Sequence, residues 1–340
     1  MKRIGVLGAG TWGMALARML CNSGHSVTVW SAIEKEIDEF SVTRRHPNLP
    51  GMVIPDGIAF TKDIQTVCAG MDILLFAVPS PFVRSTAGKA ASYVTDGQII
   101  VDVAKGIEAD TLYTMTQIIE DEIKNPAVKL VALSGPTHAE EVAKDLPTTI
   151  VSACKDQAAA LLVQEVFSCP CMRVYTNEDV VGVELCGAMK NIIALAAGIA
   201  VGLGCGDNTK AALITRGMAE IARLGTAMGC KEQTFGGLAG IGDLIVTATS
   251  VHSRNNRCGL LLGQGVAPED AVKQVGMVVE GINALPAAMR LAQMYGVEMP
   301  IVETVNAVVS GQAAVSDAIR MLMSRDQKPE LPPSALDNHY

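Results

Sequence analysis

The chain has 340 residues, of which 49% are hydrophobic and 18% are charged, and its formal net charge is -8. This length favours two domains of roughly 150 residues each, and the apolar content excludes compositional disorder for most of the chain. The negative charge excludes general binding of nucleic acid, which needs a positive surface. A phosphorylated ligand must therefore be held by a few individually placed cations.

Short runs rich in Val, Ile and Leu alternate with helical segments in the first half of the chain. The predicted strands span residues 3–8, 26–30, 72–79, 98–104 and 129–136, with two closing strands at 147–153 and 172–176. Helical spacing is found in Trp12–Ser23 and Pro81–Tyr93, whereas Arg44–Gly57 is predicted to be a loop. This alternation indicates an α/β fold, in which a doubly wound sheet of parallel strands is covered by helices on both faces.

The pattern becomes helical from about residue 179, with no strong strand signal. Helices are predicted at Asp179–Leu203, Thr209–Met228, Pro268–Val275, Ile282–Tyr295 and Ile301–Ser310. We therefore divide the chain into an α/β domain at 1–178, an all-α domain at 179–327 and a polar, Pro-rich tail at 328–340 that is expected to be disordered.

No membrane insertion is expected. The most apolar stretch, Asn191–Gly206, is shorter than the roughly 20 residues that a spanning helix needs, and it is flanked by Lys190 and Asp207, so it predicts a buried helix. A signal peptide is the alternative for the N-terminus, but three glycines and Arg18 interrupt its apolar run and no clear cleavage site follows.

The nine cysteines indicate a reducing, cytoplasmic environment, because their number is odd and none forms a C-x-x-C pair. Cys169 and Cys171 flank Pro170, but two thiols alone are weak evidence for a metal site. We therefore assign no metal.

Residues 8–13, with the sequence GAGTWG, form the strongest local motif, because they follow a predicted strand and open a helix. Gly8 permits the tight turn, Gly10 lets the backbone approach a pyrophosphate, and Gly13 lets the helix pack close to the strand. The free N–H groups at the start of the helix favour an anion. The alternative is a glycine-rich turn without a ligand.

The second predicted strand ends in Trp30, Ser31 and Ala32, where a dinucleotide site usually places an acid for the ribose hydroxyl. Neither an acid nor an arginine occurs there, although Lys35 and Arg44 are nearby. The choice between NAD and NADP therefore stays open.

Candidate ligand-binding residues follow two further strands. Lys105 follows the strand at 98–104, and Gly135 and Thr137 follow the strand at 129–136. Ligands of open parallel sheets bind outside the carboxyl ends of the strands, so Lys105 is well placed for an anionic substrate. The alternatives are a solvated loop lysine and an ordinary turn in which Thr137 caps a helix.

Lys190 is the most informative single residue, because it lies in a long apolar helix where an ammonium group is costly unless it is paired or faces a cavity. A buried lysine shifts its pKa readily, which suits acid–base work. Asn191 beside it could bond a substrate or a cofactor amide. The alternative is a lysine at a helix edge whose ammonium group reaches water.

A glycine-rich segment supplies the remaining candidates. Asp243 begins an apolar helix, where it could cap the helix or pair with Lys190, and Thr247 lies on the same helical face. The segment Ser253–Arg257 offers two guanidinium groups suited to phosphate, or else forms a solvated basic loop. No histidine has a partner at a telling spacing, so none is given a catalytic role.

Seven motifs in order make the chain resemble the NAD(P)-dependent glycerol-3-phosphate dehydrogenases of the bacterial soluble type. They begin at residues 8, 101, 134, 182, 212, 237 and 278 and read GAGTWG, VDVAKGIE, SGPTHAEEV, GVELCGAMKNIIALAAG, ALITRGMAEIARLG, GLAGIGDLIVTATSVHSRNNRCG and VVEG. The resemblance implies a Rossmann-type dinucleotide-binding domain followed by an all-α substrate and catalytic domain, of the 6-phosphogluconate dehydrogenase C-terminal type, with the active site between them.

The resemblance also implies site residues. Those implied to contact the cofactor are Thr11, Trp12, Lys105, Ala139, Arg254, Val278 and Glu280. Those implied to contact the substrate are Lys105, Gly135, Thr137, Lys190, Asp243, Ser253, Arg254 and Asn255. Lys190 matches the proton-transfer residue, and Asp243 and Lys105 complete the expected catalytic group. Many relatives carry a basic residue where this chain has Ala32 and Ile33, which puts the cofactor preference in doubt.

The function implied by this resemblance is reversible reduction of dihydroxyacetone phosphate to sn-glycerol 3-phosphate with NADH or NADPH, for phospholipid synthesis, by an enzyme that is commonly a homodimer. One alternative is a dehydrogenase of the same plan that acts on a 3-hydroxy acid or a sugar acid. Another is a nucleotide-sensing regulator, which would need no lysine–aspartate pair in its cleft.

Overall fold

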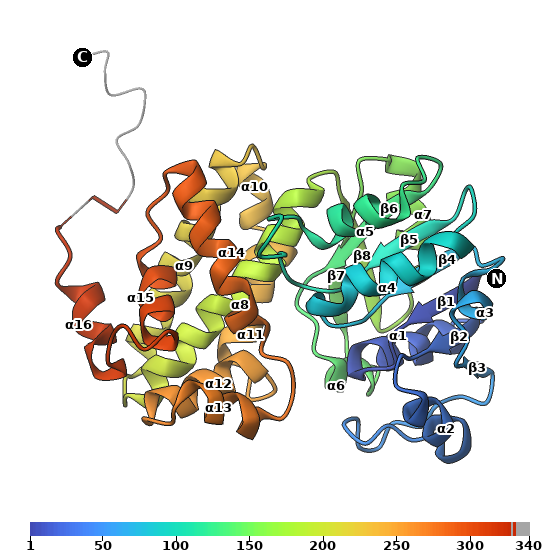
Figure 1. Cartoon of the computed structure of the whole chain (residues 1–340), viewed down its shortest axis with the longest axis horizontal. Helices are drawn as coiled ribbons and strands as arrows, with labels where there is room; N and C mark the ends of the chain where they lie inside the picture. Colours follow the sequence, from blue (N-terminus) through green and yellow to red (C-terminus); the bar gives the residue numbers. More distant parts are fainter. Residues whose placement is uncertain (328, 331–340) are drawn as a thin grey trace, which may run out of the picture.

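The computed structural model describes residues 1–327, 329 and 330. Figure 1 shows an N-terminal half built around a sheet and a C-terminal half built from helices, lying side by side. The tail predicted at 328–340 falls almost entirely outside the described residues.

One sheet of eight strands forms the centre of the N-terminal half. Its strands are β1 (Arg3–Leu7), β2 (Ser26–Trp30), β3 (Ile58–Thr61), β4 (Ile73–Phe76), β5 (Ile99–Asp102), β6 (Lys129–Ser134), β7 (Thr148–Ala153) and β8 (Met172–Asn177). Their order is β3-β2-β1-β4-β5-β6-β7-β8. All seven predicted strands are present.

Two features of the sheet differ from the sequence prediction. β3 was not predicted: it is a four-residue edge strand, paired with β2, in which only Ile58 is fully buried, so its hydrophobic signal is weak. β7 runs antiparallel to β6. The connection between these two strands contains one short helix, α6 (Ala139–Val142), whereas parallel neighbours are usually joined by a longer crossover helix.

Helices cover both faces of this sheet, as expected for a doubly wound fold. The helices of this half are α1 (Thr11–Asn22), α2 (Glu34–Thr43), α3 (Ile64–Cys68), α4 (Val83–Ala90), α5 (Met115–Ile123), α6 and α7 (Gln157–Phe167). Side chains of α1 and α7 share one core with β1, and side chains of α4 and α5 share a second core with β4 and β5. Both cores leave the carboxyl ends of β1, β4 and β5 open toward the helical half.

The C-terminal half is helical in the residues described. Its helices are α8 (Val180–Gly202), α9 (Asp207–Ala227), α10 (Glu232–Phe235), α11 (Asp243–Thr249), α12 (Arg254–Gly263), α13 (Pro268–Val275), α14 (Glu280–Tyr295), α15 (Pro300–Val309) and α16 (Ala318–Met323). A π-helical turn, Leu238–Gly242, precedes α11. Helix α12 occupies a segment that the sequence analysis treated as loop.

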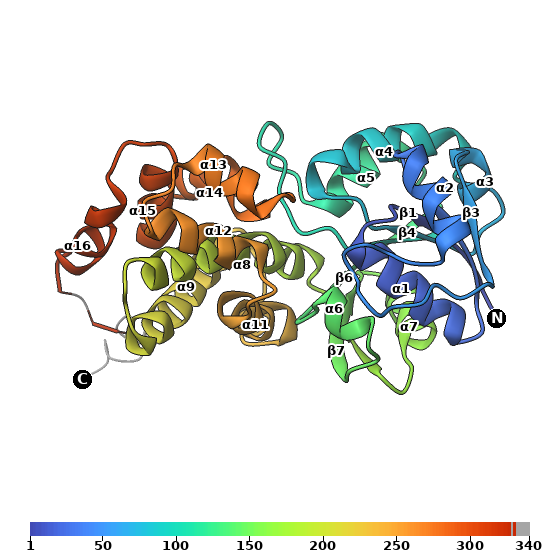
Figure 2. The same ribbon diagram turned by 90° about the horizontal axis from the view of Figure 1, so that it is seen from below.

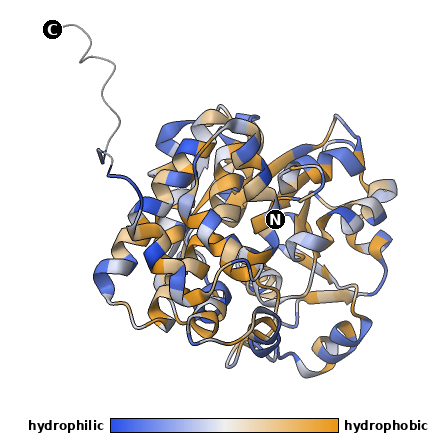
Figure 3. Ribbon diagram, turned by 60° about the vertical axis from the view of Figure 1, so that its left-hand side comes forward, coloured by the Kyte–Doolittle hydropathy of each residue, from blue (hydrophilic) through white to orange (hydrophobic). Residues whose placement is uncertain are grey.

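Helix α8 is the core of this half, and Figure 3 shows hydrophobic segments gathered inside both halves. By length and composition α8 could cross a membrane, but 89% of its apolar window is buried inside the protein, so it reads as a core helix. It packs closely against α12. A Cβ on Gly259 would lie only 2.1 Å from the carbonyl oxygen of Leu195. Gly259, together with Gly198 of α8, whose Cβ would lie 2.1 Å from the carbonyl oxygen of Asn256, permits this close approach.

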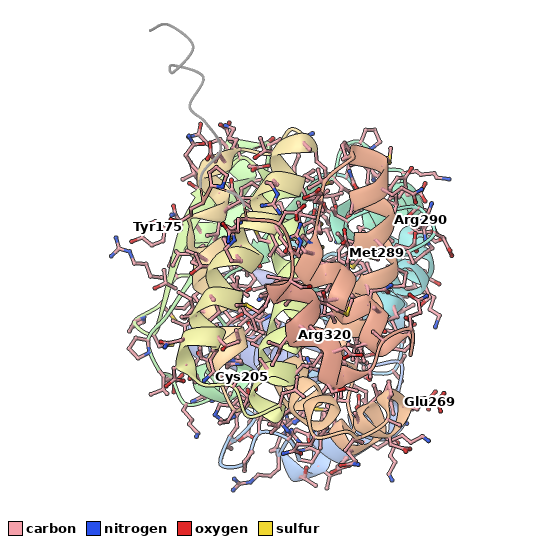
Figure 4. The ribbon with its side chains drawn as sticks, turned by 90° about the vertical axis from the view of Figure 1, so that its left-hand side faces the viewer. Tyr175, Cys205, Glu269, Met289, Arg290 and Arg320 are labelled. Atoms are coloured by element: carbon pink, nitrogen blue, oxygen red, sulfur yellow. The ribbon has the colours of Figure 1, made fainter. Side chains whose placement is uncertain are left out.

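The loop between β5 and α5 joins the two halves, and Figure 2 shows it reaching toward the helices. Ile107 in this loop is buried in the core of the helical half. Arg290, which projects from α14 in Figure 4, donates hydrogen bonds to the carbonyl oxygens of Ala109 and Asp110. The loop carries Lys105 at its start, so these contacts help to fix the position of that lysine.

Candidate functional site

A cleft lies between the two halves, at the carboxyl ends of β1, β4, β5 and β6. Eleven residues predicted from the sequence line it: Gly10, Thr11, Trp12, Lys105, Thr137, Ala139, Lys190, Ser253, Arg254, Asn255 and Glu280. The predicted residues that do not line it are Gly8, Gly13, Gly135, Asp243 and Val278. The described structure therefore gathers most of the predicted site, although the residues come from segments far apart in the sequence.

The glycines of residues 8–13 lie in two different environments. Gly8 has φ +121°, and a Cβ there would lie 2.8 Å from the carbonyl carbon of Ala77, so both conformation and space require glycine. A Cβ on Gly13 would lie 2.2 Å from the carbonyl oxygen of Gly8, whereas Gly10 has open space at its Cβ position. Gly8 and Gly13 pack against neighbouring backbone and so determine the shape of the turn, whereas Gly10 faces the cleft.

The start of α1 fits the pyrophosphate of a dinucleotide. Gly10 is its N-cap residue, no side chain accepts from the free N–H groups, and no acid lies in the first turn. These free donors and the positive end of the helix dipole point to an anion. A Cβ on Gly10 would enter the open space beside these donors.

The region after β2 contains no group placed to select between the two cofactors. The hydroxyl of Ser31 donates to Glu36, 2.6 Å away. Arg44 donates to the carbonyl oxygen of Ile58 at 2.8 Å, so its guanidinium is turned toward β3. Lys35 is exposed on α2. The structure leaves the cofactor preference as open as the sequence does.

Asp243 is completely buried and binds two lysines at once. Its Oδ1 accepts from Nζ of Lys190 at 2.5 Å, and its Oδ2 accepts from Nζ of Lys105 at 2.6 Å. The predicted pairing of Asp243 with Lys190 is confirmed, whereas its second bond to Lys105 was not foreseen. Lys105 also donates to the carbonyl oxygen of Gly135 and lies 3.4 Å from the hydroxyl of Thr137.

Lys190 is 5% exposed and lines the cleft, so its ammonium group is buried rather than turned to bulk water. Burial lowers the pKa of Lys190 to about 7, since the loss of hydration outweighs the attraction of Asp243, and Lys105 lowers the pKa further. The hydroxyl of Thr247 accepts from Lys190 at 2.6 Å. A lysine with this pKa can both give and take a proton near neutral pH.

Ser253, Arg254 and Asn255 form the start of α12 rather than a solvated loop. Ser253 is the N-cap residue, and its hydroxyl accepts from the backbone N–H of Asn256. Asn255 donates to Asn191 and accepts from the backbone N–H of Gly281. The side-chain oxygens of Ser253 and Asn255 therefore also hold the helix in place, a cap that the serine before the basic run could have signalled.

Glu280 links the two halves across the cleft. Its carboxylate accepts from the backbone N–H of Ser80 at 3.0 Å and from the hydroxyl of Ser80 at 2.5 Å. Ala139 lines the cleft at the start of α6, and Val278 is half-buried just before α14. Glu280 thus contacts the loop after β4, next to the cofactor motif.

Two histidines that line the cleft, His138 and His252, were given no role by the sequence analysis, whereas Arg257, the second of its two predicted guanidinium groups, also lines the cleft. His138 directly follows Thr137, and His252 directly precedes Ser253. Their positions next to predicted site residues could have indicated that they line the cleft. No group of three or more histidine, cysteine or acidic side chains in the described part of the chain could hold a metal ion.

Comparisons with known proteins agree with this geometry. Family models for the N-terminus and the C-terminus of NAD-dependent glycerol-3-phosphate dehydrogenase match residues 3–160 and 179–320. Glycerol-3-phosphate dehydrogenase [NAD(P)+] 2 of Lactobacillus delbrueckii subsp. bulgaricus is 66% identical, over 97% of this chain and 99% of that protein. The corresponding protein of Agathobacter rectalis is 52% identical, over 97% of this chain and 98% of its own length.

A solved structure gives the same result. The crystal structure of glycerol-3-phosphate dehydrogenase from Coxiella burnetii has a TM-score of 0.91 and 34% sequence identity, over 95% of this chain and 99% of that chain. Together with the glycine motif, the lysine–aspartate–lysine group and the two-domain plan, these similarities show that the chain belongs to the NAD-dependent glycerol-3-phosphate dehydrogenase family.

Proposed function

We propose that this protein reduces dihydroxyacetone phosphate to sn-glycerol 3-phosphate with NADH or NADPH, and catalyses the reverse reaction. The observation that carries the proposal is the buried carboxylate of Asp243, which holds Lys105 and Lys190 at the edge of a cleft with a dinucleotide motif. This group favours carbonyl reduction over a nucleotide-sensing role, and family membership favours a phosphorylated ketone over a hydroxy acid or a sugar acid.

Lys190 is the proposed general acid. When bound, the reduced nicotinamide supplies the hydride. Lys190 then gives its proton to the oxygen that becomes the alcohol, and in the reverse direction it takes that proton back. Asp243 orients Lys190, and Lys105 adds positive charge near the reacting oxygen, where it stabilises developing negative charge.

The two ligands are held by different parts of the cleft in this proposal. Residues proposed to bind the cofactor are Gly8, Gly10, Thr11, Trp12, Gly13, Lys105, Ala139, Arg254, Val278 and Glu280. Residues proposed to bind the substrate are Lys105, Gly135, Thr137, Lys190, Asp243, Ser253, Arg254 and Asn255. The guanidinium of Arg254 binds the substrate phosphate, because its planar fork matches two phosphate oxygens.

The biological setting is part of the proposal. We divide the chain into a dinucleotide-binding domain at 1–178 and a catalytic domain at 179–327; the family-model matches to residues 3–160 and 179–320 support a division into two parts. The protein acts as a cytoplasmic homodimer and supplies glycerol 3-phosphate for phospholipid synthesis.

An absorbance assay at the nicotinamide band tests the proposed reaction. We expect dihydroxyacetone phosphate to oxidise NADH or NADPH in the presence of the purified full-length protein, and parallel titrations give the cofactor preference. Cofactor binding without any oxidation would instead support the sensor alternative.

A further inference from the structure

Two histidines face each other across the cleft, one from each half of the molecule. His138 lies at the start of α6, and His252 lies in the connection between α11 and α12. Both line the cleft, and their ring centroids are 5.9 Å apart at an interplanar angle of 58°. This spacing is typical of a direct ring–ring contact, so the pair is a bridge between the halves.

His138 contacts the helical half through both its ring face and its Nε2. Its Nε2 lies 3.4 Å from the carbonyl oxygen of Val246 in α11, and because a carbonyl oxygen only accepts, Nε2 carries the proton. Burial, with the nearby charges of Lys190 and Lys105, lowers the pKa of His138 despite the opposing effects of Val246 and Glu140. The ring therefore lies against His252, and its lowered pKa disfavours a further positive charge beside the two lysines.

The backbone of His252 is held by hydrogen bonds, whereas its imidazole forms none with the described residues. Its backbone N–H donates to the hydroxyl of Ser250 at 3.1 Å, and Ser253 closes the connection by donating to the carbonyl oxygen of Ser250. Among the residues that the structure describes, none forms a hydrogen bond with the imidazole of His252. The ring nitrogens of His252 are therefore available to a ligand in the cleft, and the contact with His138 limits where the ring can lie.

The charge around His252 fits a phosphate. Four cationic side chains of the described residues line the cleft: Lys105, Lys190, Arg254 and Arg257. Two carboxylates, Glu140 and Glu280, also line it, but Glu280 is already bonded to Ser80. His252 lies two residues before Arg254, and an imidazole N–H can donate a hydrogen bond to a phosphate oxygen.

We propose that His252 is a phosphate-binding residue, held in place across the cleft by the ring of His138, and that the pair selects for a phosphorylated ketone. The inference rests on the proposed function and adds to its substrate site. Because His138 comes from the other half of the molecule, phosphate binding also favours the approach of the two halves. His138 is a positioning residue here, since it acts through His252.

Initial rates with dihydroxyacetone phosphate and with phosphate-free dihydroxyacetone test His252. In His252→Ala and His252→Gln, we expect kcat/KM for the phosphorylated ketone to fall about 10- to 100-fold, mainly through KM, as for a lost hydrogen bond to a charged group. The value for dihydroxyacetone should stay within about twofold of the original enzyme, since no phosphate is lost. Val251→Ala is the matched control, because Val251 is 78% exposed in the same connection.

A double-mutant cycle tests the role of His138. His138→Phe and His138→Ala should each raise KM for dihydroxyacetone phosphate, and neither should add to the loss once His252 is alanine. Additive losses would show that His138 acts independently and would overturn the pairing. Equal losses with both ketones, or no loss with the phosphorylated one, would overturn the role of His252.

The two levels of proposal fail in different ways. An unmodified protein that does not oxidise NADH or NADPH with dihydroxyacetone phosphate contradicts the proposed function itself. An active protein whose histidine variants behave like Val251→Ala contradicts only the phosphate-binding pair.

Discussion

At the residue scale, one buried carboxylate holds the two lysines of the proposed catalytic group together. Asp243 has no exposed surface and accepts from both Lys105 and Lys190. A buried carboxylate is costly unless it is paired, and the loss of one partner would leave an uncompensated charge. The two lysines and Asp243 therefore behave as one unit, in which each position depends on the other two.

Replacement of Lys190 by alanine should lower kcat at least about 100-fold, because the reaction loses its general acid. Initial rates with saturating dihydroxyacetone phosphate measure this effect, and thermal unfolding shows whether the fold is kept. Lys89→Ala is the control, because Lys89 is an exposed lysine of α4. Normal turnover in a folded Lys190→Ala protein would exclude the proposed role.

The pH dependence follows from the pKa of Lys190, which burial lowers to about 7. Reduction of the ketone needs the protonated amine, so kcat/KM for reduction should decline as the pH rises through about 7. Oxidation of glycerol 3-phosphate needs the neutral amine, so its kcat/KM should rise over the same range. Measurement of kcat/KM against pH for both reduction and oxidation tests this expectation. The same pH dependence in both directions would contradict the role of Lys190 as the general acid and base.

At the scale of elements, the turn from β1 into α1 combines two different demands for glycine. Gly13 packs against the backbone of Gly8, which a Cβ would overlap. Gly10 lies on the side of the turn that faces the cleft, where a Cβ would meet open space. Packing therefore determines the first position, and ligand binding determines the second.

Alanine at these two positions should separate stability from binding. Gly13→Ala should lower the free energy of unfolding by about 1–3 kcal/mol, because the added methyl group overpacks the turn. Gly10→Ala should leave unfolding nearly unchanged and raise the KM for the cofactor. Denaturant unfolding and cofactor titration measure the two effects, and the same stability loss in both variants would refute the distinction.

At the scale of the whole molecule, the cleft depends on contacts between the two halves. Glu280 binds Ser80 beside the cofactor motif, and Arg290 binds the loop that carries Lys105. These contacts join the dinucleotide side of the cleft to the helical side. Ligand binding should therefore respond to changes that lie outside the lysine–aspartate group.

Glu280→Ala should raise the KM for the nicotinamide cofactor about 5- to 10-fold, the size expected for one lost hydrogen-bonded contact. The physical reason is that the halves lose their link at Ser80, beside the loop that lines the cleft. Glu269→Ala, at an exposed acid labelled in Figure 4, is the control. An unchanged cofactor KM in Glu280→Ala would show that this contact is not part of the cofactor site.

Much of the fold could be predicted from the sequence, because it depends on local patterns. Buried strands require short apolar runs, and a phosphate turn requires glycines at fixed spacing, so seven strands and residues 8–13 were placed correctly. A lysine inside an apolar helix must find a partner, which is why Lys190 and Asp243 could be paired before the structure was known.

The tertiary structure alone decided the features that depend on how distant segments dock. The edge strand β3 is recognised only by its pairing with β2, and the antiparallel direction of β7 only by its register with β6. Lys105 and Asp243 are 138 residues apart, and His138 and His252 come from opposite halves. The local sequence specifies each side chain, but only the packing of the two halves determines which side chains share one cleft.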